Sequence, residues 1–192
     1  MIETARLILR PFAEGDAADA FEYLKAPTVN CFACMKLASL EEAQAEMKKR
    51  AADPELYFAI VLKENGKVIG EIFASAQATA PDEQDAALDT FSPCWMLHPA
   101  CHGKGYAYEA AEAYFNYLFN EKGARRIYAY TEDYNLPSQR LCEKLGMRRE
   151  GLFLEFVSFV NNPDGTPIYE NTMQYALLKK EWKHSRSGSD AR

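Results

Sequence analysis

The segment from residue 88 to residue 118 limits most strongly what this chain can fold into. Residues 88–97 have the pattern of a strand, two closely spaced glycines follow at Gly103 and Gly105, and a helix then begins near Gly105. The helix carries one apolar stripe with helical spacing, formed by Ala107, Ala110, Ala111, Tyr114 and Leu118. Two glycines allow a tight turn, and a helix start directs unpaired N–H groups to one point. The joint predicts an anion site suited to a phosphate or pyrophosphate, although the glycines alone are equally consistent with a simple turn.

Two familiar phosphate-binding motifs do not fit this joint. A P-loop needs a glycine five residues before Gly103 and a Ser or Thr after the Gly-Lys pair, but His98 and Gly105 occupy these positions. A dinucleotide fingerprint needs Gly or Ala where Tyr108 stands, and it should open a βαβ unit. A phosphate would have to be held in another way.

Hydrophobic periodicity predicts a chain in which strands dominate and helices enter at a few joints. Strands are expected at residues 4–10, 57–63, 67–76, 88–97, 125–131, 147–160 and 168–178. Helices are expected at residues 16–25, 40–51, from 105 to a C-cap at Gly123, and 135–145. Pro93 indicates that the strand at 88–97 is an edge, has a bulge or has a splayed end. This order predicts a mixed sheet with helices on its faces.

The composition excludes several classes of protein. Of 192 residues, 48% are hydrophobic and 26% are charged, which is ordinary for a globular chain and unlike a disordered, collagen-like or disulfide-rich one. The net charge of −6 argues against a nucleic-acid binder held by phosphate contacts. No apolar run approaches the roughly 20 residues of a membrane span, and the first residues lack the features of a signal peptide. We expect a cytoplasmic protein without a membrane partner, in which residues 183–192 form a disordered polar tail.

The five cysteines raise the alternative of a metal site. They are Cys31, Cys34, Cys94, Cys101 and Cys142. Their odd number and irregular spacing do not indicate a disulfide framework. Cys31 and Cys34 form a CxxC pair, but the group of Cys94, His98, Cys101 and His102 matches no common zinc spacing. We expect ordinary buried or half-buried thiols and no bound metal.

A second polar segment begins at Asn135. Asn135 and Ser138 are three residues apart, so they lie on one side of the first turn of the predicted helix. They can present polar groups to the strand before them, although helix capping explains both residues locally.

Four motifs in order resemble the GNAT acetyltransferases, which use acetyl-CoA. The sequence HGKGYAYEA at 102–110 matches their pyrophosphate-binding motif, and the N-x-x-S…E-K-L-G-M segment at 135–147 matches their next motif. The opening E-T-x-R-L-x-L-R-P-F and the closing Y-A-L…E-W look like the RimJ/RimL-type branch, which acetylates N-terminal amines of ribosomal proteins. The resemblance covers nearly the whole chain, and we expect residues 1–182 to form a single domain.

The resemblance implies an α/β fold whose mixed, mostly antiparallel sheet has about seven strands, is splayed in the middle and carries helices on both faces. The strand at 88–97 would part from the strand at 125–131, and the pantetheine arm would pair with the exposed strand edge. The residues that the resemblance implies for acetyl-CoA binding are Met96, Leu97, His98, His102, Gly103, Lys104, Gly105, Tyr106, Ala107, Asn135, Ser138 and Cys142.

Two positions depart from the family pattern. His102 stands where Gln, Arg or an aromatic residue is common, and Cys142 stands where many members carry a Tyr that protonates the departing thiolate. RimJ/RimL-type members often lack this Tyr and use the Ser of the N-x-x-S segment. The resemblance therefore makes Ser138 the first candidate for this role and Cys142 the second.

Acetyl transfer to an amine requires a neutral nucleophile, so a base should accept a proton. Glu155 is the first candidate, because it alternates with apolar residues on one face of a predicted strand, where desolvation would raise its pKa. Glu71, which we expect on the side of Ile69 and Phe73, is the second candidate, and His98 is the third. No covalent enzyme intermediate is required.

The function implied is acetyl-CoA-dependent N-acetylation of a primary amine, on a protein N-terminus or a small molecule, by direct attack in a ternary complex. Aromatic and acidic residues in 11–53 and 152–170 would form the acceptor walls by analogy. The alternative is a CoA-binding sensor or structural module without catalysis, which Cys142 favours slightly. A homodimer is a further expectation, because dimers are common in this family.

Overall fold

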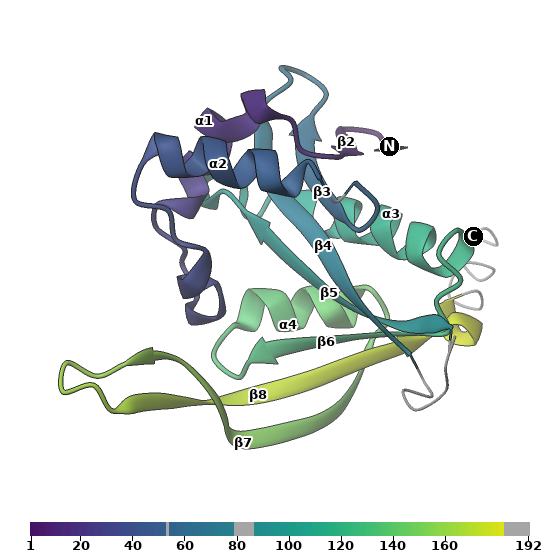
Figure 1. Ribbon diagram of the computed structural model, residues 1–192. Coiled ribbons are helices and arrows are strands. Elements are labelled where there is room, and N and C mark those ends of the chain that lie inside the picture. Colours follow the sequence, from purple (N-terminus) through teal and green to yellow (C-terminus); the bar gives the residue numbers. More distant parts are fainter. Residues whose placement is uncertain (53, 79–86, 183–192) are drawn as a thin grey trace.

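The computed structural model describes residues 1–52, 54–78 and 87–182, and within them the strands form one eight-stranded sheet (Figure 1). The strand order is β1-β2-β3-β4-β5-β6-β8-β7. All neighbouring strands are antiparallel except β5 and β6, which are parallel. The strands are β1 (Ile2–Glu3), β2 (Leu7–Arg10), β3 (Tyr57–Leu62), β4 (Val68–Ala78), β5 (Leu88–Leu97), β6 (Arg126–Glu132), β7 (Arg148–Asn161) and β8 (Pro167–Leu178). The predicted tail at 183–192 lies outside the described residues.

Helices cover both faces of this sheet (Figure 1). The α-helices are α1 (Ala17–Leu24), α2 (Leu40–Arg50), α3 (Tyr106–Asn120) and α4 (Leu136–Lys144), and the 3₁₀ helices are η1 (Glu14–Asp16), η2 (Asn30–Met35) and η3 (Pro99–Cys101). Alternate residues of β3 divide the core: Phe58 and Ile60 join the buried cluster of α3 and α4, whereas Ala59 and Val61 join that of α1 and α2. The fold class predicted from the sequence is confirmed.

The order of the predicted elements is also confirmed, and most boundaries differ by one or two residues. The sheet has eight strands rather than about seven because Ile2–Glu3 forms a short additional strand before the predicted strand at 4–10, which itself begins only at Leu7. The Thr4 N–H donates to the Leu7 carbonyl, and the Thr4 hydroxyl accepts from the Leu7 N–H, at 3.0 and 2.9 Å. This tight turn separates β1 from β2.

Two bulges change which side chains share a face of the sheet. The register between β3 and β4 shifts at Ile60 and Val61, so Ile69 is an extra residue in β4. The register between β7 and β8 shifts between Phe153 and Val157, and Glu155 within this stretch has a φ of 47°. Both shifts bear on the predicted catalytic residues. In the described part of the chain, no helix has the length and apolar character needed to cross a membrane.

Candidate active site

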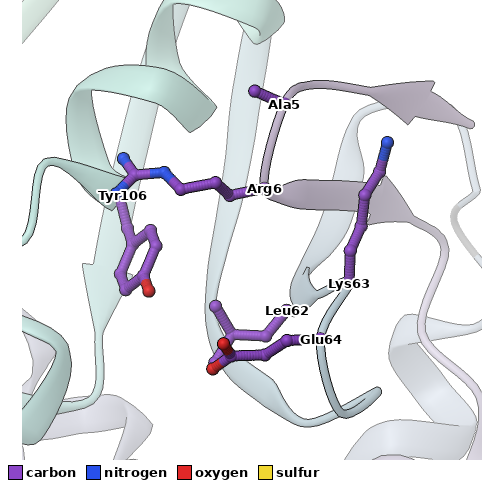
Figure 2. A pocket seen from close by; sticks show the side chains of 6 residues that line it. All are labelled: Ala5, Arg6, Leu62, Lys63, Glu64 and Tyr106. Carbon is purple, nitrogen blue, oxygen red and sulfur yellow. The ribbon is translucent and has the colours of Figure 1, made fainter.

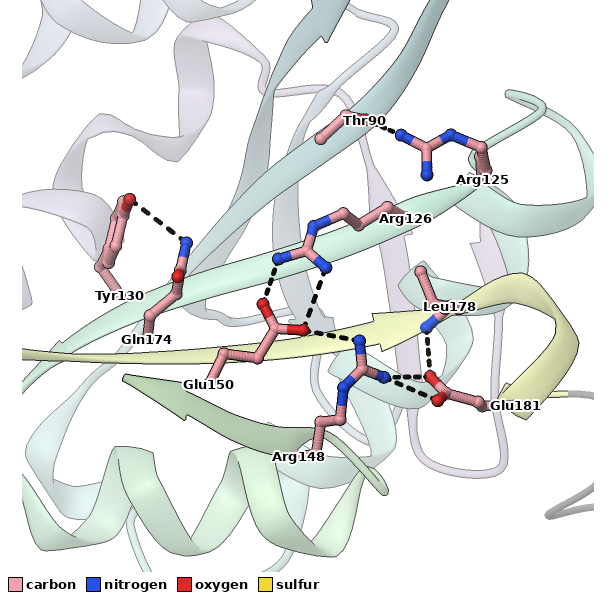
Figure 3. Close-up of polar contacts among 9 residues, drawn as sticks. All are labelled: Thr90, Arg125, Arg126, Tyr130, Arg148, Glu150, Gln174, Leu178 and Glu181. Atoms are coloured by element: carbon pink, nitrogen blue, oxygen red, sulfur yellow. Dashed lines mark hydrogen bonds and ion pairs between the residues drawn. The ribbon is translucent and has the colours of Figure 1, made fainter. Parts of the chain in front are cut away.

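The parallel strands β5 and β6 pair only at their first residues and then diverge (Figure 1). The paired positions are Thr90 with Arg126 and Phe91 with Ile127. Arg125 ties this closed end, because its side chain contacts Asp89 at 2.8 Å and the Thr90 hydroxyl at 3.3 Å (Figure 3 shows the second contact). Beyond it, β5 extends to Leu97 and β6 to Glu132 without further pairing between them. The splay predicted for the middle of the sheet is confirmed.

The backbone of β5 presents an unpaired edge to this divergence. The Asp89 carbonyl bonds toward β6 and the His98 N–H bonds to Ile69 of β4, so odd-numbered residues of β5 face β6 and even-numbered ones face β4. The N–H groups of Trp95 and Leu97 therefore have no ladder partner on the side of β6 within the described residues. Pro93 shares this edge, where its missing N–H costs no ladder bond.

This alternation separates two of the predicted cofactor residues. The backbone of Leu97 faces β6, and its carbonyl contacts the His102 ring Nε2 at 3.0 Å. The backbone of Met96 faces β4 opposite Glu71, and its side chain is buried in the cluster of α1 and α2. Of these two expected cofactor residues, only Leu97 has its backbone on the side of the divergence, so the contact of Met96 with the cofactor stays a prediction without support from its backbone.

The loop after β5 has the geometry that the two glycines predict. Gly103 and Gly105 have φ values of 74° and 81°, a left-handed conformation that L residues with a side chain rarely adopt. α3 begins directly afterwards at Tyr106, and its N-cap residue, Gly105, has no side chain that could cap the helix. The N–H groups of the first turn of α3, which include that of Ala107, are thus available to an anion at the positive end of the helix dipole.

His98 and Lys104 lie at the margins of this loop. The His98 Nδ1 accepts the Ala100 N–H at 3.1 Å, which caps η3, and its Nε2 lies 3.5 Å from Glu22. This capping role matches a turn residue and gives no support to His98 as a base. Lys104 is exposed, and its carbonyl accepts a hydrogen bond from the guanidinium of Arg6 at 3.0 Å.

At the start of α4, Asn135 accepts the Ser138 N–H at 3.3 Å and donates to Glu132 at 3.2 Å. The half-buried Ser138 hydroxyl has no hydrogen-bond partner among the described residues, and it lies in the first turn of the helix. Cys142, one helical turn further on, is completely buried in the core, and burial raises the pKa of its thiol to about 12. This buried position gives no support to the expected contact of Cys142 with the cofactor, which stays a prediction.

Thr131 on β6 supplies an orphaned polar atom beside the divergence. Its side chain is 4% exposed, and its hydroxyl has no hydrogen-bond partner in the described residues. Alternation places it on the α3 and α4 face, together with Ile127 and Ala129. A buried hydroxyl without a partner is rare in a folded protein. The orphaned hydroxyl, the unpaired strand edge and the uncapped helix start fit a long ligand that has amide groups and a phosphate end.

Glu71 is completely buried on the opposite face, between α1, α2 and the sheet. Its carboxylate accepts hydrogen bonds from the Tyr23 and Tyr57 hydroxyls at 3.0 and 2.9 Å and forms an ion pair with Arg50. Burial raises the pKa of Glu71, and the charge of Arg50 opposes this rise. The bulge at Ile69 puts that residue on the α3 face, so Glu71 shares a face with Phe73 but not with Ile69, contrary to our expectation.

Glu155 does not lie where the sequence pattern places it. The bulge between Phe153 and Val157 breaks the alternation, and Glu155 is exposed at its positive φ. Its backbone N–H donates to the Asn171 side chain at 3.0 Å. The prediction that an apolar strand face desolvates Glu155 is therefore wrong.

Two other carboxylates lie on the Glu71 face near the end of β6. Glu132 is 3% exposed and Glu170 is 6% exposed, and neither has a Lys, Arg or His partner in the described residues. Glu132 accepts the Cys31 N–H at 3.3 Å, and Glu170 accepts from the Asn30 side chain at 2.5 Å and the Tyr134 hydroxyl at 3.0 Å. η2 is thereby held against both acids.

Cys94 connects these acids to the splayed strand. Burial raises the pKa of its thiol to about 11, and the negative charges of Glu71 and Glu132 add to this rise. The side chain of Cys94 on β5 is thus within electrostatic range of both carboxylates. We did not single out Glu132 from the sequence; the signal available was an acid at the carboxyl end of the strand at 125–131, three residues before the capping Asn135.

In the described residues, no group of three or more His, Cys, Asp and Glu side chains could hold a metal ion, so the structure gives no support to the alternative of a metal site.

Comparison with known proteins identifies the family. The profile of the acetyltransferase (GNAT) domain matches residues 6–148. The chain belongs to the GNAT acetyltransferases.

Relatives of this GNAT acetyltransferase span nearly its whole length. YnaD of Bacillus subtilis (strain 168), an uncharacterized N-acetyltransferase, is 31% identical over 181 residues, which are 94% of this chain and 98% of YnaD. A GNAT acetyltransferase from Bacillus anthracis has a crystal structure with a TM-score of 0.78 at 28% identity, covering 94% of this chain and 99% of that one. A chimera of the spermidine N-acetyltransferase SpeG from Vibrio cholerae and hSSAT has a TM-score of 0.70 at 19% identity, covering 93% and 99%, which shows a shared fold.

The predicted GNAT acetyltransferase of the RimJ/RimL type is therefore confirmed, and this chain is an N-acetyltransferase. GNAT enzymes typically use acetyl-CoA. The diverging strands, the glycine loop and the start of α4 lie together in this GNAT domain as the motifs predict.

Proposed function

We propose that this enzyme transfers the acetyl group of acetyl-CoA directly to a primary amine, on a protein N-terminus or a small molecule, within one domain formed by residues 1–182. The observation that carries the proposal is the divergence of β5 and β6 beside an uncapped helix start. Acetyl-CoA supplies an acyl group activated as a thioester. A cytoplasmic location and a homodimer stay predictions.

Three groups of this chain would hold acetyl-CoA. N–H groups from Gly103 to Ala107 would bind the pyrophosphate at the positive end of α3. The backbone of Trp95 and the N–H of Leu97, which lack ladder partners among the described residues, would bond to the pantetheine amides in the manner of an added strand. The Thr131 hydroxyl would receive the partner that it lacks in the described protein.

Glu132 is our candidate for the base that accepts the proton of the amine. It is buried, it has no cationic partner in the described residues, and it lies near Cys94 on the splayed part of β5. Glu71 is a weaker candidate than Glu132, because Arg50 and two tyrosine hydroxyls already bind its carboxylate. Glu155 is weaker still, because it is exposed.

Ser138 is our candidate for stabilising and protonating the departing thiolate. Its half-buried hydroxyl is available among the described residues, and the Asn135 cap fixes the first turn of α4 around it. The positive end of the α4 dipole also favours a developing negative charge. Ser138 and Glu132 are linked through Asn135, which contacts the backbone of the first and the side chain of the second.

Replacing Glu132 by glutamine should lower kcat by about 10²-fold or more, because a positioned base contributes about 10² to 10⁴. The unmodified enzyme should lose rate at low pH, and this dependence should weaken in the variant, which lacks the carboxylate. The measurement is a pH–rate profile at saturating acetyl-CoA. Glu155→Gln is the matched control and should keep the profile of the unmodified enzyme; a normal Glu132→Gln profile with a reduced Glu155→Gln one would reverse the assignment.

The proposed activity itself is tested by following thiol release from acetyl-CoA with a panel of amines. Peptides with a free N-terminus represent the RimJ/RimL-type acceptors, and spermidine represents the substrate named for the SpeG structure. We expect one class to be acetylated, with the product identified by mass spectrometry. Binding of acetyl-CoA without turnover of any amine would instead favour the non-catalytic module.

A further inference from the structure

The opening motif of the sequence has a structural role that the proposed reaction does not explain. Arg6 directly precedes β2, and its side chain extends to the start of α3, as Figure 2 shows. Its guanidinium donates to the Lys104 carbonyl at 3.0 Å and lies 4.5 Å from the centre of the Tyr106 ring. A Cβ built on Gly105 would lie 3.4 Å from the Arg6 guanidinium. Arg6 thus packs against the glycine loop and the first residue of α3.

The contact with Lys104 orients the peptide unit inside this loop. In a trans peptide, the C=O of one residue and the N–H of the next point in opposite directions. Because the Lys104 carbonyl is turned toward Arg6, the Gly105 N–H points away from Arg6. The loop also has free space beside Gly103, because nothing lies within 4 Å of a Cβ built on that residue.

Arg6 also neutralises the acid in the first turn of α3. Glu109 accepts the backbone N–H and the Nε of Arg6 at 2.8 and 2.7 Å, and the Thr4 hydroxyl at 2.6 Å. Burial alone would raise the pKa of Glu109, but these hydrogen bonds outweigh it and lower the pKa, so the carboxylate is charged at neutral pH. An unpaired carboxylate this close to the helix start would repel a phosphate group.

We propose that Arg6 is a positioning residue for acetyl-CoA, which holds the Lys104 carbonyl and compensates the charge of Glu109 so that the glycine loop is ready to bind the pyrophosphate. The inference rests on the proposed function, because it assumes that the loop binds acetyl-CoA. It assigns the Thr4 and Arg6 part of the opening motif and Glu109 of the glycine motif to one network.

The neighbouring cavity is not itself the anion site. It has a volume of about 190 Å³ and is lined by Ala5, Arg6, Leu62, Lys63, Glu64 and Tyr106 (Figure 2). Both of its cations are already paired, Arg6 with Glu109 at 2.7 Å and Lys63 with Glu3 at 3.0 Å. Lys63 points away from the glycine loop in Figure 2, which makes it a matched control for the loss of a surface cation.

The test measures the Kd of acetyl-CoA and of S-acetylpantetheine, which lacks the pyrophosphate and the nucleotide, by titration calorimetry. Arg6→Ala should raise the Kd of acetyl-CoA about tenfold, since a hydrogen bond to a charged group is lost and Glu109 is left unpaired, and should leave the Kd of S-acetylpantetheine unchanged. Lys63→Ala should change neither value. Adding Glu109→Gln to Arg6→Ala should recover part of the acetyl-CoA affinity, because the uncompensated charge is removed.

Two results would overturn the inference while leaving the proposed function intact. One is an unaltered Kd for acetyl-CoA in Arg6→Ala, and the other is an equal loss for both ligands, which would indicate a general structural defect. Arg6→Lys keeps the charge but not the planar fork, so it provides a second, less disruptive variant with an intermediate expected Kd. Failure of the unmodified protein to bind acetyl-CoA would overturn the proposed function as well.

Discussion

Replacing Gly103 by glutamate should raise the Kd of acetyl-CoA by about 100-fold or more. A carboxylate introduced at this loop would lie close to the proposed pyrophosphate position, and two like charges about 4 Å apart repel by about 4 kcal/mol near a protein surface. The site has room for the side chain, because nothing lies within 4 Å of a Cβ built on Gly103. The measurement is calorimetric titration of both proteins with acetyl-CoA.

Gly66→Glu is the control for backbone strain. Gly66 lies in the turn between β3 and β4, has a φ of 74° like Gly103, and also has open space around a built Cβ. Both substitutions should therefore destabilise the fold by a similar amount, about 1 kcal/mol. Only Gly103→Glu should weaken binding; an equal Kd for the two variants would remove the glycine loop from the acetyl-CoA site.

Replacing Arg50 by methionine should destabilise the protein by about 3–5 kcal/mol, because it leaves the buried carboxylate of Glu71 without its ion pair. The Arg50 side chain is 3% exposed and that of Glu71 is 0% exposed, so water cannot compensate either charge. Only the Tyr23 and Tyr57 hydroxyls would remain on Glu71. Urea unfolding of the variant and the unmodified protein measures the difference.

The destabilisation caused by Arg50→Met should depend on pH. Burial already raises the pKa of Glu71, and removing the positive charge of Arg50 should raise it further. A raised pKa in the folded state gives stability that is present at low pH and is lost as the pH rises through that pKa. The deficit of Arg50→Met should therefore shrink as the pH falls toward 5. Arg50→Met with Glu71→Gln should recover much of the stability at pH 7, and a deficit that is independent of pH would contradict this account.

Hydrophobic periodicity and glycine positions suffice to predict the order of elements and the glycine loop, whereas the splay is an expectation that the resemblance to the GNAT family implies. The positive φ values of Gly103 and Gly105 and the Asn135 cap follow from local residue chemistry. The position of Pro93 also has a local explanation, because a residue without an N–H is tolerated at an unpaired strand edge. These features depend on residues that are near one another in the sequence.

The candidate catalytic residues could not be placed in the same way, because they depend on bulges. One inserted residue, as at Ile69, moves the following side chains to the other face, whereas two extra residues lie between Phe153 and Val157 in the ladder with β8. The bulge at Ile69 separates that residue from Glu71, and the bulge around Glu155 exposes a side chain that alternation predicts to be half-buried. Periodicity does not reveal where a ladder slips, so a strand-face argument fails at both positions.

Glu132 and Cys142 show that contacts between distant segments also escape a sequence pattern. Glu132 lies against η2, which is about 100 residues earlier in the chain and supplies the Cys31 N–H that donates to its carboxylate. Cys142 occupies a motif position, but packing of α4 against the sheet buries it completely. The contact of Glu132 with η2 and the burial of Cys142 both depend on packing between segments that are distant in the sequence.

Amide hydrogen exchange on β5, measured by NMR with and without saturating acetyl-CoA, tests the central claim most directly. The N–H groups of Trp95 and Leu97 face the divergence from β6 and lack ladder partners in the described residues, whereas those of Cys94 and Met96 face β4 and serve as internal references. If acetyl-CoA lies along this edge, exchange at Trp95 and Leu97 should slow by about tenfold or more on binding, with little change at the references. Unchanged exchange at Trp95 and Leu97 in the saturated protein would contradict the placement of acetyl-CoA between β5 and β6.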